Sequence, residues 1–430
     1  AYVGHIALRL AAMGVEAWER AATAQEIERM AELLEDALDA GALGLSDNLH
    51  DHDGDDRPIP TLKAEDEEFE ALFDVMARYP QTTYQVIVDT FMRMTAPDQM
   101  TRLERLTRGR GIRMQIAGAV PTLGFQKPIL AKCQDTLNSM REAGADVWPG
   151  FAHVSPTSTL SLTKSLIFAQ SNDYVWHEVV LADSDDEKRA LLADEDWRVR
   201  ARNSWDTKAW DHSPLKNPDE LFLLDSENGK GPVGGTLKEY ADERGQHRSD
   251  AMADWILDNG VKSTVHMAPF PKDEELTVEL MKSEQALGNV SDAGAHLQML
   301  CGGGENILTF TKYVAEGHLT MEEAVHYLTG KPARFFNLQE TGTLEVGKRA
   351  DIAVFDLDEI EYQTIEKAWD MPDGKGGTTW CFTRPAAPMR LTLVNGVATF
   401  RDGKQTDARP GEYLVPALAN ENERILEAAE

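Results

Sequence analysis

The sequence predicts an α/β fold in which helices alternate with parallel strands, followed by a section built of strands alone. Segments with apolar residues at helical spacing lead through short connections into short apolar runs, as far as about residue 291. Such alternation is typical of parallel strands joined by crossover helices. From residue 342 onward the helical periodicity stops, and short apolar runs between turn residues indicate strands.

The first part of the chain shows the alternation clearly. Residues 24–40 carry apolar side chains at helical spacing, among them Ile27, Met30 and Leu34, and Gly41 ends this helix. The same spacing predicts further helices over 64–79, 96–109 and 128–143. The strands predicted to follow these four helices cover 42–45, 84–88, 112–116 and 147–151.

Residues 155–245 interrupt the rhythm. They are rich in Asp, Trp and Ser, and we interpret them as an insertion over the mouth of the fold. The alternation then resumes, with predicted helices 249–259, 273–284, 305–316 and 321–329 and predicted strands 263–267 and 287–291. In the last section we expect strands 351–355 and 391–394, and a hairpin turn at Asn395-Gly396. We therefore predict one domain over 1–341, including the insertion, and a β portion over 342–430.

Composition limits the classes of function. The formal net charge of −30 argues against nucleic acid or an anionic membrane as a partner. No segment approaches the roughly 18 consecutive apolar residues of a membrane span. Three widely spaced cysteines, Cys133, Cys301 and Cys381, allow neither a disulfide framework nor a Cys-x-x-Cys zinc motif. We therefore expect a protein of the reducing cytoplasm.

The hexapeptide at residues 291–296 is the most informative short motif. It reads Ser291-Asp292-Ala293-Gly294-Ala295-His296 and directly follows an apolar strand-like run. A carboxylate at the carboxyl end of a barrel strand is a typical position for chemistry, where it can bind a metal or exchange a proton with water. The alternative is a structural turn, in which Asp292 only accepts backbone N–H bonds.

Longer patterns give the motif a context. The chain reads Thr329-Gly330-Lys331-Pro332-Ala333, then GTLEVGKRADIAVFD over 342–356, and later Val394-Asn395-Gly396. This order resembles the C-terminal signature of the amidohydrolase superfamily. The SDAGAH hexapeptide, together with Val3-Gly4-His5 and Gly41-Ala42-Leu43-Gly44-Leu45-Ser46, is similar to the N-acyl-D-amino-acid deacylase (D-aminoacylase) group of that superfamily.

The resemblance implies a (β/α)8 TIM-like barrel with a small β-sandwich portion at the C-terminus. It implies a metal-dependent hydrolase of linear amide C–N bonds, in which Asp292 is the proton shuttle and a ligand of zinc. The family's opening strands and its metal-binding His-x-His have no match here, so we expect the N-terminal part of the barrel, with the other zinc ligands, to be absent from this sequence.

Two histidines expected from the resemblance are missing. The group places metal-binding histidines at the ends of the fifth and sixth barrel strands, which match 84–88 and 112–116. Here these strands lead into Asp89-Thr90 and Gly118-Ala119. We therefore expect one zinc ion rather than two. Two alternatives stay open: a cyclic amidase of the dihydroorotase or hydantoinase type, and a metal-free barrel that serves as a binding or assembly protein.

Several polar residues are candidates for binding a small-molecule substrate similar to an N-acyl amino acid. Ser291 and His296 belong to the hexapeptide, His153 follows strand 147–151, and His266 lies on strand 263–267. His52 ends the only His-x-His of the chain, in an acidic loop whose simpler interpretation is an exposed turn. Candidate partners for a substrate carboxylate are Arg93, Arg113 and Lys262. The sequence is compatible with a homo-oligomer.

Overall fold

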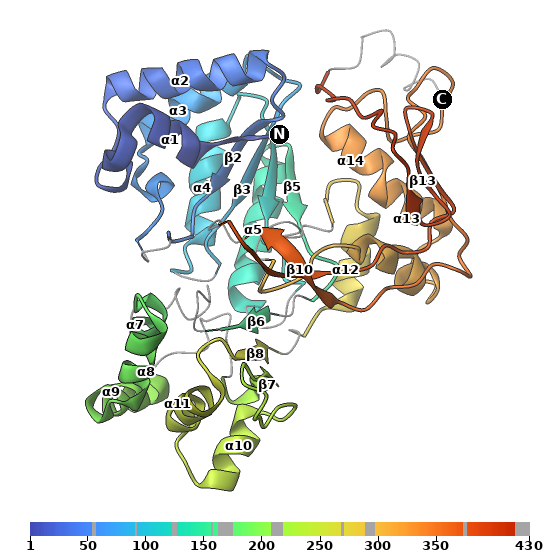
Figure 1. Cartoon of the computed structure of the whole chain (residues 1–430). Coiled ribbons are helices and arrows are strands. Elements are labelled where there is room, and N and C mark those ends of the chain that lie inside the picture. Colours follow the sequence, from blue (N-terminus) through green and yellow to red (C-terminus); the bar gives the residue numbers. More distant parts are fainter. Residues whose placement is uncertain are drawn as a thin grey trace.

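The computed structural model shows a parallel sheet covered by helices, an attached helical lobe and a C-terminal group of strands (Figure 1). In Figure 1 the sheet and its helices run from blue to cyan, the lobe is green, and the C-terminal strands are orange to red. The structure describes residues 1–53, 57–90, 93–122, 127–155, 158–161, 175–207, 218–267, 271–288, 297–372 and 376–417.

Five strands of the described chain form one parallel sheet in chain order. Each strand pairs in parallel with the next, so their carboxyl ends lie along the same edge. The predicted parallel neighbours 84–88, 112–116 and 147–151 are confirmed, while 42–45 is displaced by about two residues. The strands are β1 (Val3–Gly4), β2 (Gly44–Asn48), β3 (Thr83–Ile87), β4 (Arg113–Ala117) and β5 (Val147–Gly150).

The sheet continues beyond β5 through one further residue. Leu287 forms a parallel bridge with Gly150, and its backbone N–H donates to the Pro149 carbonyl at 2.9 Å. The Phe151 N–H donates in turn to the Leu287 carbonyl at 3.0 Å. The start of the predicted strand 287–291 is therefore beside β5, and residues 289–291 lie outside the described residues.

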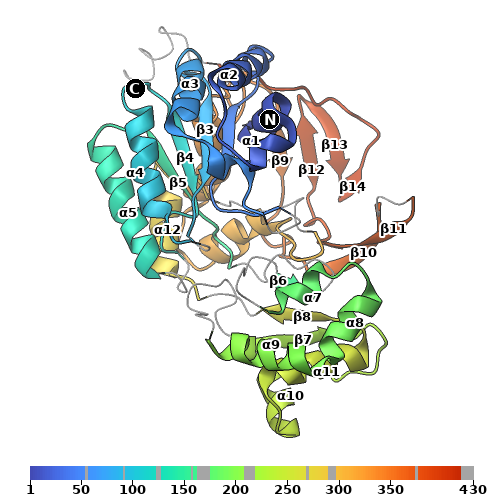
Figure 2. The ribbon, with the colours of Figure 1, turned by 90° about the vertical axis from the view of Figure 1, so that its left-hand side faces the viewer.

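Helices cover one face of this sheet, and the other face is polar. Leu45, Tyr84 and Met114 are fully buried in the same apolar cluster as the helices. The alternate residues Ser46 and Gln85, which point to the opposite face, are only partly buried. Figures 1 and 2 show the helices beside the sheet: α1 (His5–Met13), α2 (Ala24–Asp39), α3 (Asp66–Met76), α4 (Ala96–Thr107) and α5 (Lys127–Glu142).

Local sequence explains where these elements begin and meet. Thr23 and Glu26 form a capping box that fixes the start of α2, and its buried positions repeat at intervals of four residues. Between β2 and β3, Gly44 has φ of 140°, and a Cβ there would lie 1.8 Å from the Thr83 carbonyl oxygen. Only glycine permits this close approach of two backbones.

A buried ionic network fastens the first strands to the helices. His5 lies between Asp47 of β2, at 2.8 Å from Nδ1 to Oδ2, and Glu68 of α3, at 2.6 Å from Nε2 to Oε1. Arg9 of α1 donates to the second oxygen of Glu68, and the Tyr84 hydroxyl donates to Asp47 at 3.2 Å. We call His5, Arg9, Asp47, Glu68 and Tyr84 the His5 network.

The network requires a charged histidine. Both neighbours of the His5 ring are carboxylates, which accept hydrogen bonds, so both ring nitrogens carry protons. Burial opposes this charge, but the carboxylates of Asp47 and Glu68 outweigh burial and raise the pKa of His5 to about 9. His5 and Arg9 then balance the two carboxylates, which is how buried charges are tolerated.

The segment after β5 forms a lobe with its own apolar cluster, which includes Trp176, Trp197 and Trp255. Its strands are β6 (Ser158–Leu160), β7 (Phe222–Asp225) and β8 (Thr264–Met267), and β8 pairs antiparallel with both others. Its helices are α7 (His177–Leu181), α8 (Asp185–Ala193), α9 (Glu195–Thr207), α10 (Leu237–Arg244) and α11 (Arg248–Asn259).

The lobe corrects one expectation. We expected strand 263–267 to rejoin the parallel sheet, but β8 belongs to the lobe, whose elements therefore extend past residue 245. A four-residue strand after a helix has the same sequence pattern in either sheet, which explains the error. The predicted domain boundaries, 1–341 and 342–430, stay a prediction.

The chain returns to the sheet through α12 (Glu274–Lys282), α13 (Met321–Leu328) and α14 (Gly330–Phe335). The helix predicted over 305–316 is instead a 3₁₀ turn at Glu305–Ile307 and a π-helical turn at Thr309–Val314. Both turns keep helical side-chain spacing over a few residues, so periodicity does not separate them from an α-helix.

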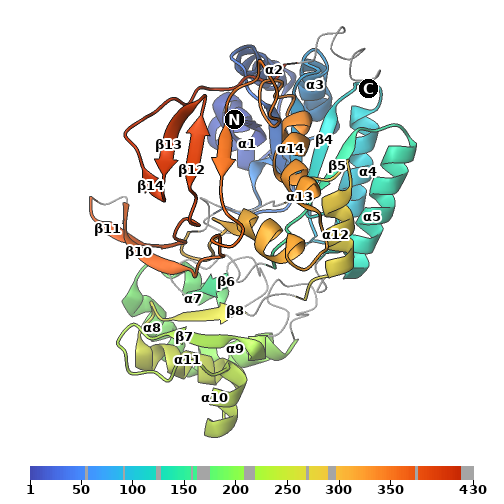
Figure 3. The same ribbon diagram turned by 90° about the vertical axis from the view of Figure 1, so that its right-hand side faces the viewer.

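The predicted C-terminal β portion is present (Figure 3). Its main sheet contains β9 (Ile352–Val354), β12 (Leu391–Val394), β13 (Val397–Arg401) and β14 (Lys404–Gln405). The hairpin turn at Asn395-Gly396 is confirmed, because both residues have positive φ, 49° and 77°, as a type I′ turn requires. A second hairpin, β10 (Glu366–Pro372) with β11 (Thr378–Thr383), was not expected from the sequence.

Within the described ranges, no helix is both long and apolar enough to cross a bilayer.

The His5 network should make stability depend on pH. The charged form of His5 is stabilised in the folded state, so its contribution is complete below the unfolded pKa of 6.5 and is lost as pH rises through about 9. The shift corresponds to about 3 kcal/mol. We expect His5→Gln to lower the free energy of unfolding by about 3–5 kcal/mol at pH 6 and to abolish most of this pH dependence, measured by urea denaturation.

The exposed His318, which pairs with Glu316, provides the matched control. His318→Gln should leave both the stability and its pH dependence close to those of the unchanged protein. An equal loss of stability between pH 6 and pH 9.5 in the unchanged protein and in His5→Gln would contradict the charged His5.

Candidate active site

Polar groups gather where β2 and β3 end. Asn48 closes β2, and its side-chain carbonyl accepts the backbone N–H groups of His50 and Asp51 at 3.0 and 3.2 Å. This turn directs the chain away from the sheet edge. The Thr61 hydroxyl donates to the Asn48 carbonyl at 2.5 Å and holds the returning chain beside it. The sharp turn therefore keeps the loop of residues 50–53 next to the carboxyl end of β2.

Asp89 and Arg93 form a pair at the carboxyl end of β3. The Asp89 side chain is fully buried, and its two oxygens accept the Arg93 backbone N–H at 3.1 and 3.0 Å. The guanidinium Nε of Arg93 lies 3.0 Å from Asp89 Oδ2, and its Nη2 donates to the His50 carbonyl at 3.1 Å. Arg93 therefore joins the ends of β2 and β3 and still exposes about a third of its side chain.

The three predicted cations separate in the structure. Arg93 lies at the carboxyl ends of the strands, as described above. Arg113 begins β4, so it lies at the opposite, amino end of the sheet, where it pairs with Asp146 at 2.7 Å. Lys262 is on the lobe, 3.8 Å from Asp185. The position of a residue along its strand decides whether its side chain lies at the carboxyl or the amino end of the sheet. The sequence pattern alone did not show this position for the three cations.

His153 follows β5, and both its ring nitrogens and its backbone carbonyl have hydrogen-bond partners. Its Nε2 donates to the Glu305 carbonyl at 3.1 Å, so Nδ1 accepts from the Tyr327 hydroxyl at 3.1 Å. Burial lowers the pKa of His153 to about 4, which keeps the ring neutral. Its backbone carbonyl accepts from Lys272 and Tyr313 at 2.6 and 2.9 Å.

The remaining predicted histidines are not brought to one point. His52 forms an isolated bridge with Pro58 in the loop after β2, and its N–H donates to Asp51 at 2.8 Å. His266 lies on β8 in the lobe, where its Nδ1 is 3.4 Å from the Thr159 hydroxyl. Burial lowers the pKa of His266. Among the described residues, His50, His52 and Asp89 thus belong to the β2–β3 edge, His153 to β5, and His266 to a different sheet.

Ser291, Asp292 and His296 lie outside the described residues. The structure describes the residues up to Gly288, which follows Leu287. A Cβ at Gly288 would lie 1.6 Å from the Tyr327 hydroxyl oxygen. Tyr327 is the same side chain that holds His153. The glycine therefore permits the contact that positions His153.

The residues after the hexapeptide are bound by two other parts of the fold. The Phe382 N–H of β11 donates to the Leu297 carbonyl at 2.7 Å, and the Thr159 N–H of β6 donates to the Met299 carbonyl at 2.7 Å. Gln298 donates to Thr379 and Trp380 at 3.1 and 2.8 Å. The unexpected β10–β11 hairpin and the lobe therefore both reach the segment that follows the hexapeptide.

The described residues do not form a complete metal site. Within them, no group of three or more His, Cys, Asp or Glu side chains could hold an ion. Asp89 follows the strand at whose end the family resemblance implies a metal-binding histidine. Both oxygens of Asp89, however, contact Arg93. The donor set that we describe thus does not fit the two-metal arrangement.

Comparison with known proteins supports the sequence pattern. Residues 237–400 match the model of the amidohydrolase family. An uncharacterised protein of Mycobacterium tuberculosis is 26% identical over 446 residues, covering 96% of this chain and 71% of the relative. The N-acyl-D-glutamate deacylase of Alcaligenes xylosoxydans xylosoxydans is 32% identical over 180 residues, covering 40% of this chain and 33% of that enzyme.

A solved structure shows the same fold. The N-acyl-D-glutamate deacylase from Bordetella bronchiseptica superposes with a TM-score of 0.55 at 20% identity, covering 97% of this chain and 71% of that chain. The predicted TIM-barrel-like α/β fold is confirmed at this level, while closure of the barrel stays a prediction. The predicted class, a hydrolase that acts on C–N bonds, is likewise confirmed. Residues 237–400 are thus assigned to the amidohydrolase family, and the chain as a whole shares the fold of the deacylase structure.

Proposed function

We propose that the protein hydrolyses the linear amide bond of a small N-acyl amino acid, with Asp292 as the group that moves the proton. The observation that carries this proposal is the bridge between Leu287 and Gly150. It puts the chain beside β5, with the SDAGAH sequence starting four residues later. In barrel enzymes the carboxyl ends of the strands carry the chemistry.

Amide hydrolysis requires an attacking water and a proton for the leaving amine. A carboxylate in contact with the water accepts its proton and returns it to the amine nitrogen as the C–N bond breaks. We assign this role to Asp292. The deacylases that resemble the chain in sequence and in fold support a linear amide as the bond that is cleaved.

Arg93 is our candidate for the residue that binds the carboxylate of the substrate. A guanidinium binds a carboxylate through two parallel N–H bonds. Of the three cations proposed from the sequence, Arg93 is the one at the carboxyl ends of the strands, and Asp89 fixes its orientation through Nε. His52, His153, His266, Ser291 and His296 stay predictions as substrate contacts, and His153 would act through the position of its ring rather than through charge.

Zinc stays a proposal for the cofactor, with Asp292 as one ligand. The deacylase of Bordetella bronchiseptica was crystallised with zinc and a phosphonate that mimics the tetrahedral intermediate of its reaction. The described residues supply no three-residue donor group here. The cyclic-amide and metal-free alternatives stay open, and a panel that includes cyclic amides such as dihydroorotate distinguishes them.

The first test concerns Asp292. Replacement by Asn keeps the shape of the side chain and removes the base, so the kcat for release of free amino acid from N-acetyl-D-amino acids should fall at least about a hundredfold. The melting temperature should change little. His296→Ala, in the same hexapeptide, should cost less. Unchanged kcat in Asp292→Asn would overturn the assignment, and a collapsed melting temperature would support a structural turn.

The second test concerns Arg93. Lysine keeps the charge but loses the planar fork, so Arg93→Lys should raise KM about tenfold with a smaller change in kcat. Arg78→Lys is the matched control, because Arg78 pairs with Glu35 on the helical side of the sheet. If both variants change KM equally, Arg93 has no special contact with substrate.

The third test concerns the metal. The two strand ends lack histidine, so elemental analysis of the dialysed protein should find no more than about one zinc-like ion per chain. Two tightly held ions per chain would contradict the reasoning from the missing histidines. Activity that survives complete removal of metal by a chelator would argue against zinc as the cofactor.

A further inference from the structure

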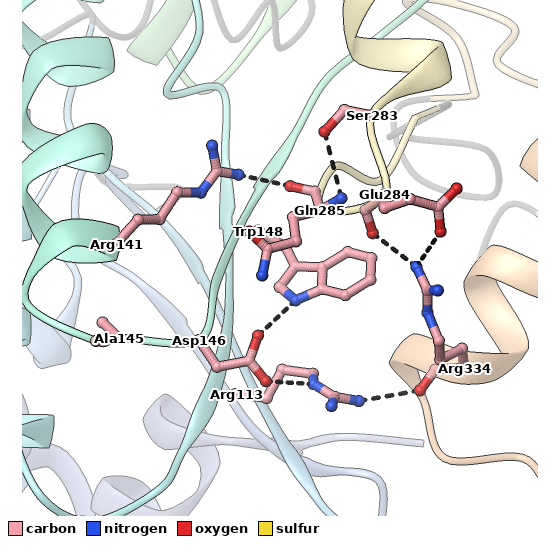
Figure 4. A pocket seen from close by; sticks show the side chains of 10 residues that line it. Arg113, Arg141, Ala145, Asp146, Trp148, Ser283, Glu284, Gln285 and Arg334 are labelled. Carbon is pink, nitrogen blue, oxygen red and sulfur yellow. Dashed lines mark hydrogen bonds and ion pairs between the residues drawn. The ribbon is translucent and has the colours of Figure 1, made fainter. Parts of the chain in front are cut away.

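A hollow of about 810 Å³ opens at the amino end of the parallel sheet, opposite to the candidate active site. Its walls come from the start of β4, the end of α5, the turn before β5, the segment 283–285 and α14. Figure 4 shows Arg113, Arg141 and Arg334 entering from different sides around the indole of Trp148. Pockets that hold small molecules commonly have volumes of about 300–1,000 Å³.

Two of the arginines have carboxylate partners. Arg113 pairs with Asp146 at 2.7 Å, and Asp146 also accepts the indole N–H of Trp148 at 2.7 Å. Arg334 pairs with Glu284 at 2.6 Å. Both guanidinium groups also lie over the Trp148 ring, at 5.9 and 5.5 Å from its centroid, which fixes their planes.

Arg141 differs from the other two. Its Nη2 donates to the Gln285 carbonyl at 2.6 Å and its Nε to the Val147 carbonyl at 3.3 Å. In the part of the chain that the structure describes, no carboxylate pairs with it, and burial lowers its pKa. A half-buried guanidinium that contacts only neutral carbonyls keeps an uncompensated charge, which favours an anion beside it.

The wider surroundings strengthen the positive potential. Lys331 is fully buried, and its ammonium donates to the carbonyls of Met281 and Ser283 at 2.6 and 2.8 Å, directly behind the wall of the hollow. Three guanidinium groups thus face two carboxylates, with a further cation close by. In a chain with a net charge of −30, this local excess of cations contrasts with the overall charge.

We propose that this hollow, which we call the arginine pocket, binds a small oxyanion, a carboxylate or a phosphate, between Arg141 and Arg334. The oxyanion accepts the N–H groups that Arg141 and Arg334 do not use for Gln285 and Glu284. The site is separate from the proposed amidase chemistry, because it lies at the opposite end of the strands.

Occupancy of the arginine pocket also acts on the strand that leads to Asp292. Gln285, whose carbonyl holds Arg141, lies two residues before Leu287, which pairs beside β5. An anion that fixes Arg141 therefore also fixes the start of this segment. A ligand that binds the folded protein alone raises its stability by mass action.

The test titrates the protein with succinate and, separately, with inorganic phosphate at constant ionic strength. We expect a saturable rise in melting temperature with at least one of them, and the anion that saturates at lower concentration identifies the carboxylate or the phosphate. Arg141→Gln should weaken that binding at least about tenfold. Arg29→Gln removes the same charge from an exposed pair on α2 and should leave binding unchanged.

A second measurement needs no variant. Phenylglyoxal modifies accessible guanidinium groups, and peptide mass spectrometry gives the rate at each arginine. The binding anion should slow modification of Arg141 and Arg334 while Arg29 reacts at its original rate. Absence of a saturable shift with both anions, or equal binding by Arg141→Gln, or unprotected Arg141, would overturn the proposal.

Discussion

The pairing of charges behind the first strands constrains much of the fold. His5 lies at the junction of β1 and α1, Asp47 belongs to β2 and Glu68 to α3, so one imidazolium joins three elements that are far apart in sequence. Each of these groups would be costly to bury alone. The charges of the network are therefore paired only when α1 and α3 pack against the sheet in one arrangement, and this arrangement aligns the carboxyl ends of β1 and β2.

The two faces of the parallel sheet differ in polarity: one packs against helices and the other carries polar side chains. Leu45, Tyr84 and Met114 pack against helices, and their burial supplies the apolar contribution. Ser46, Gln85 and Gln115 alternate with them and leave a polar face. Asp89 and Arg93 lie at the carboxyl ends of the strands, and the arginine pocket lies at their amino ends.

The sequence predicted β2 to β5 because helical and strand patterns alternate between residues 24 and 151, but it did not predict the two-residue β1. It predicted the Asn395-Gly396 turn because only residues tolerant of positive φ fit it. It failed for β8, since a strand such as Thr264–Met267 looks the same in a parallel or an antiparallel sheet. It also missed the β10–β11 hairpin, whose residues are mostly half-exposed or exposed and carry little apolar periodicity.

The sequence predicted the motif of the candidate site, but it predicted few of the contacts that the site residues make. Asp89 was visible as a departure from histidine, but its pairing with Arg93 depends on a turn that brings the backbone N–H of residue 93 onto the carboxylate. The orientation and tautomer of the His153 ring likewise depend on Tyr327 and Glu305, which are more than 150 residues away in sequence. Such long-range partners leave no local signature.

Asp89 at the end of β3 takes the place of the histidine that the resemblance implies, and this replacement has a chemical consequence. A neutral imidazole offers a lone pair to a metal, whereas a carboxylate already bonded to a guanidinium holds that guanidinium in place. Asp89 is fully buried and its oxygens contact the Arg93 backbone and side chain, so its geometry favours orientation of Arg93 over ligation. The strand end that serves metal binding in the deacylase pattern is thus arranged here to present a cation. Under the proposed function, this cation attracts the carboxylate of the substrate at the end of β3, and Asp292 transfers the proton.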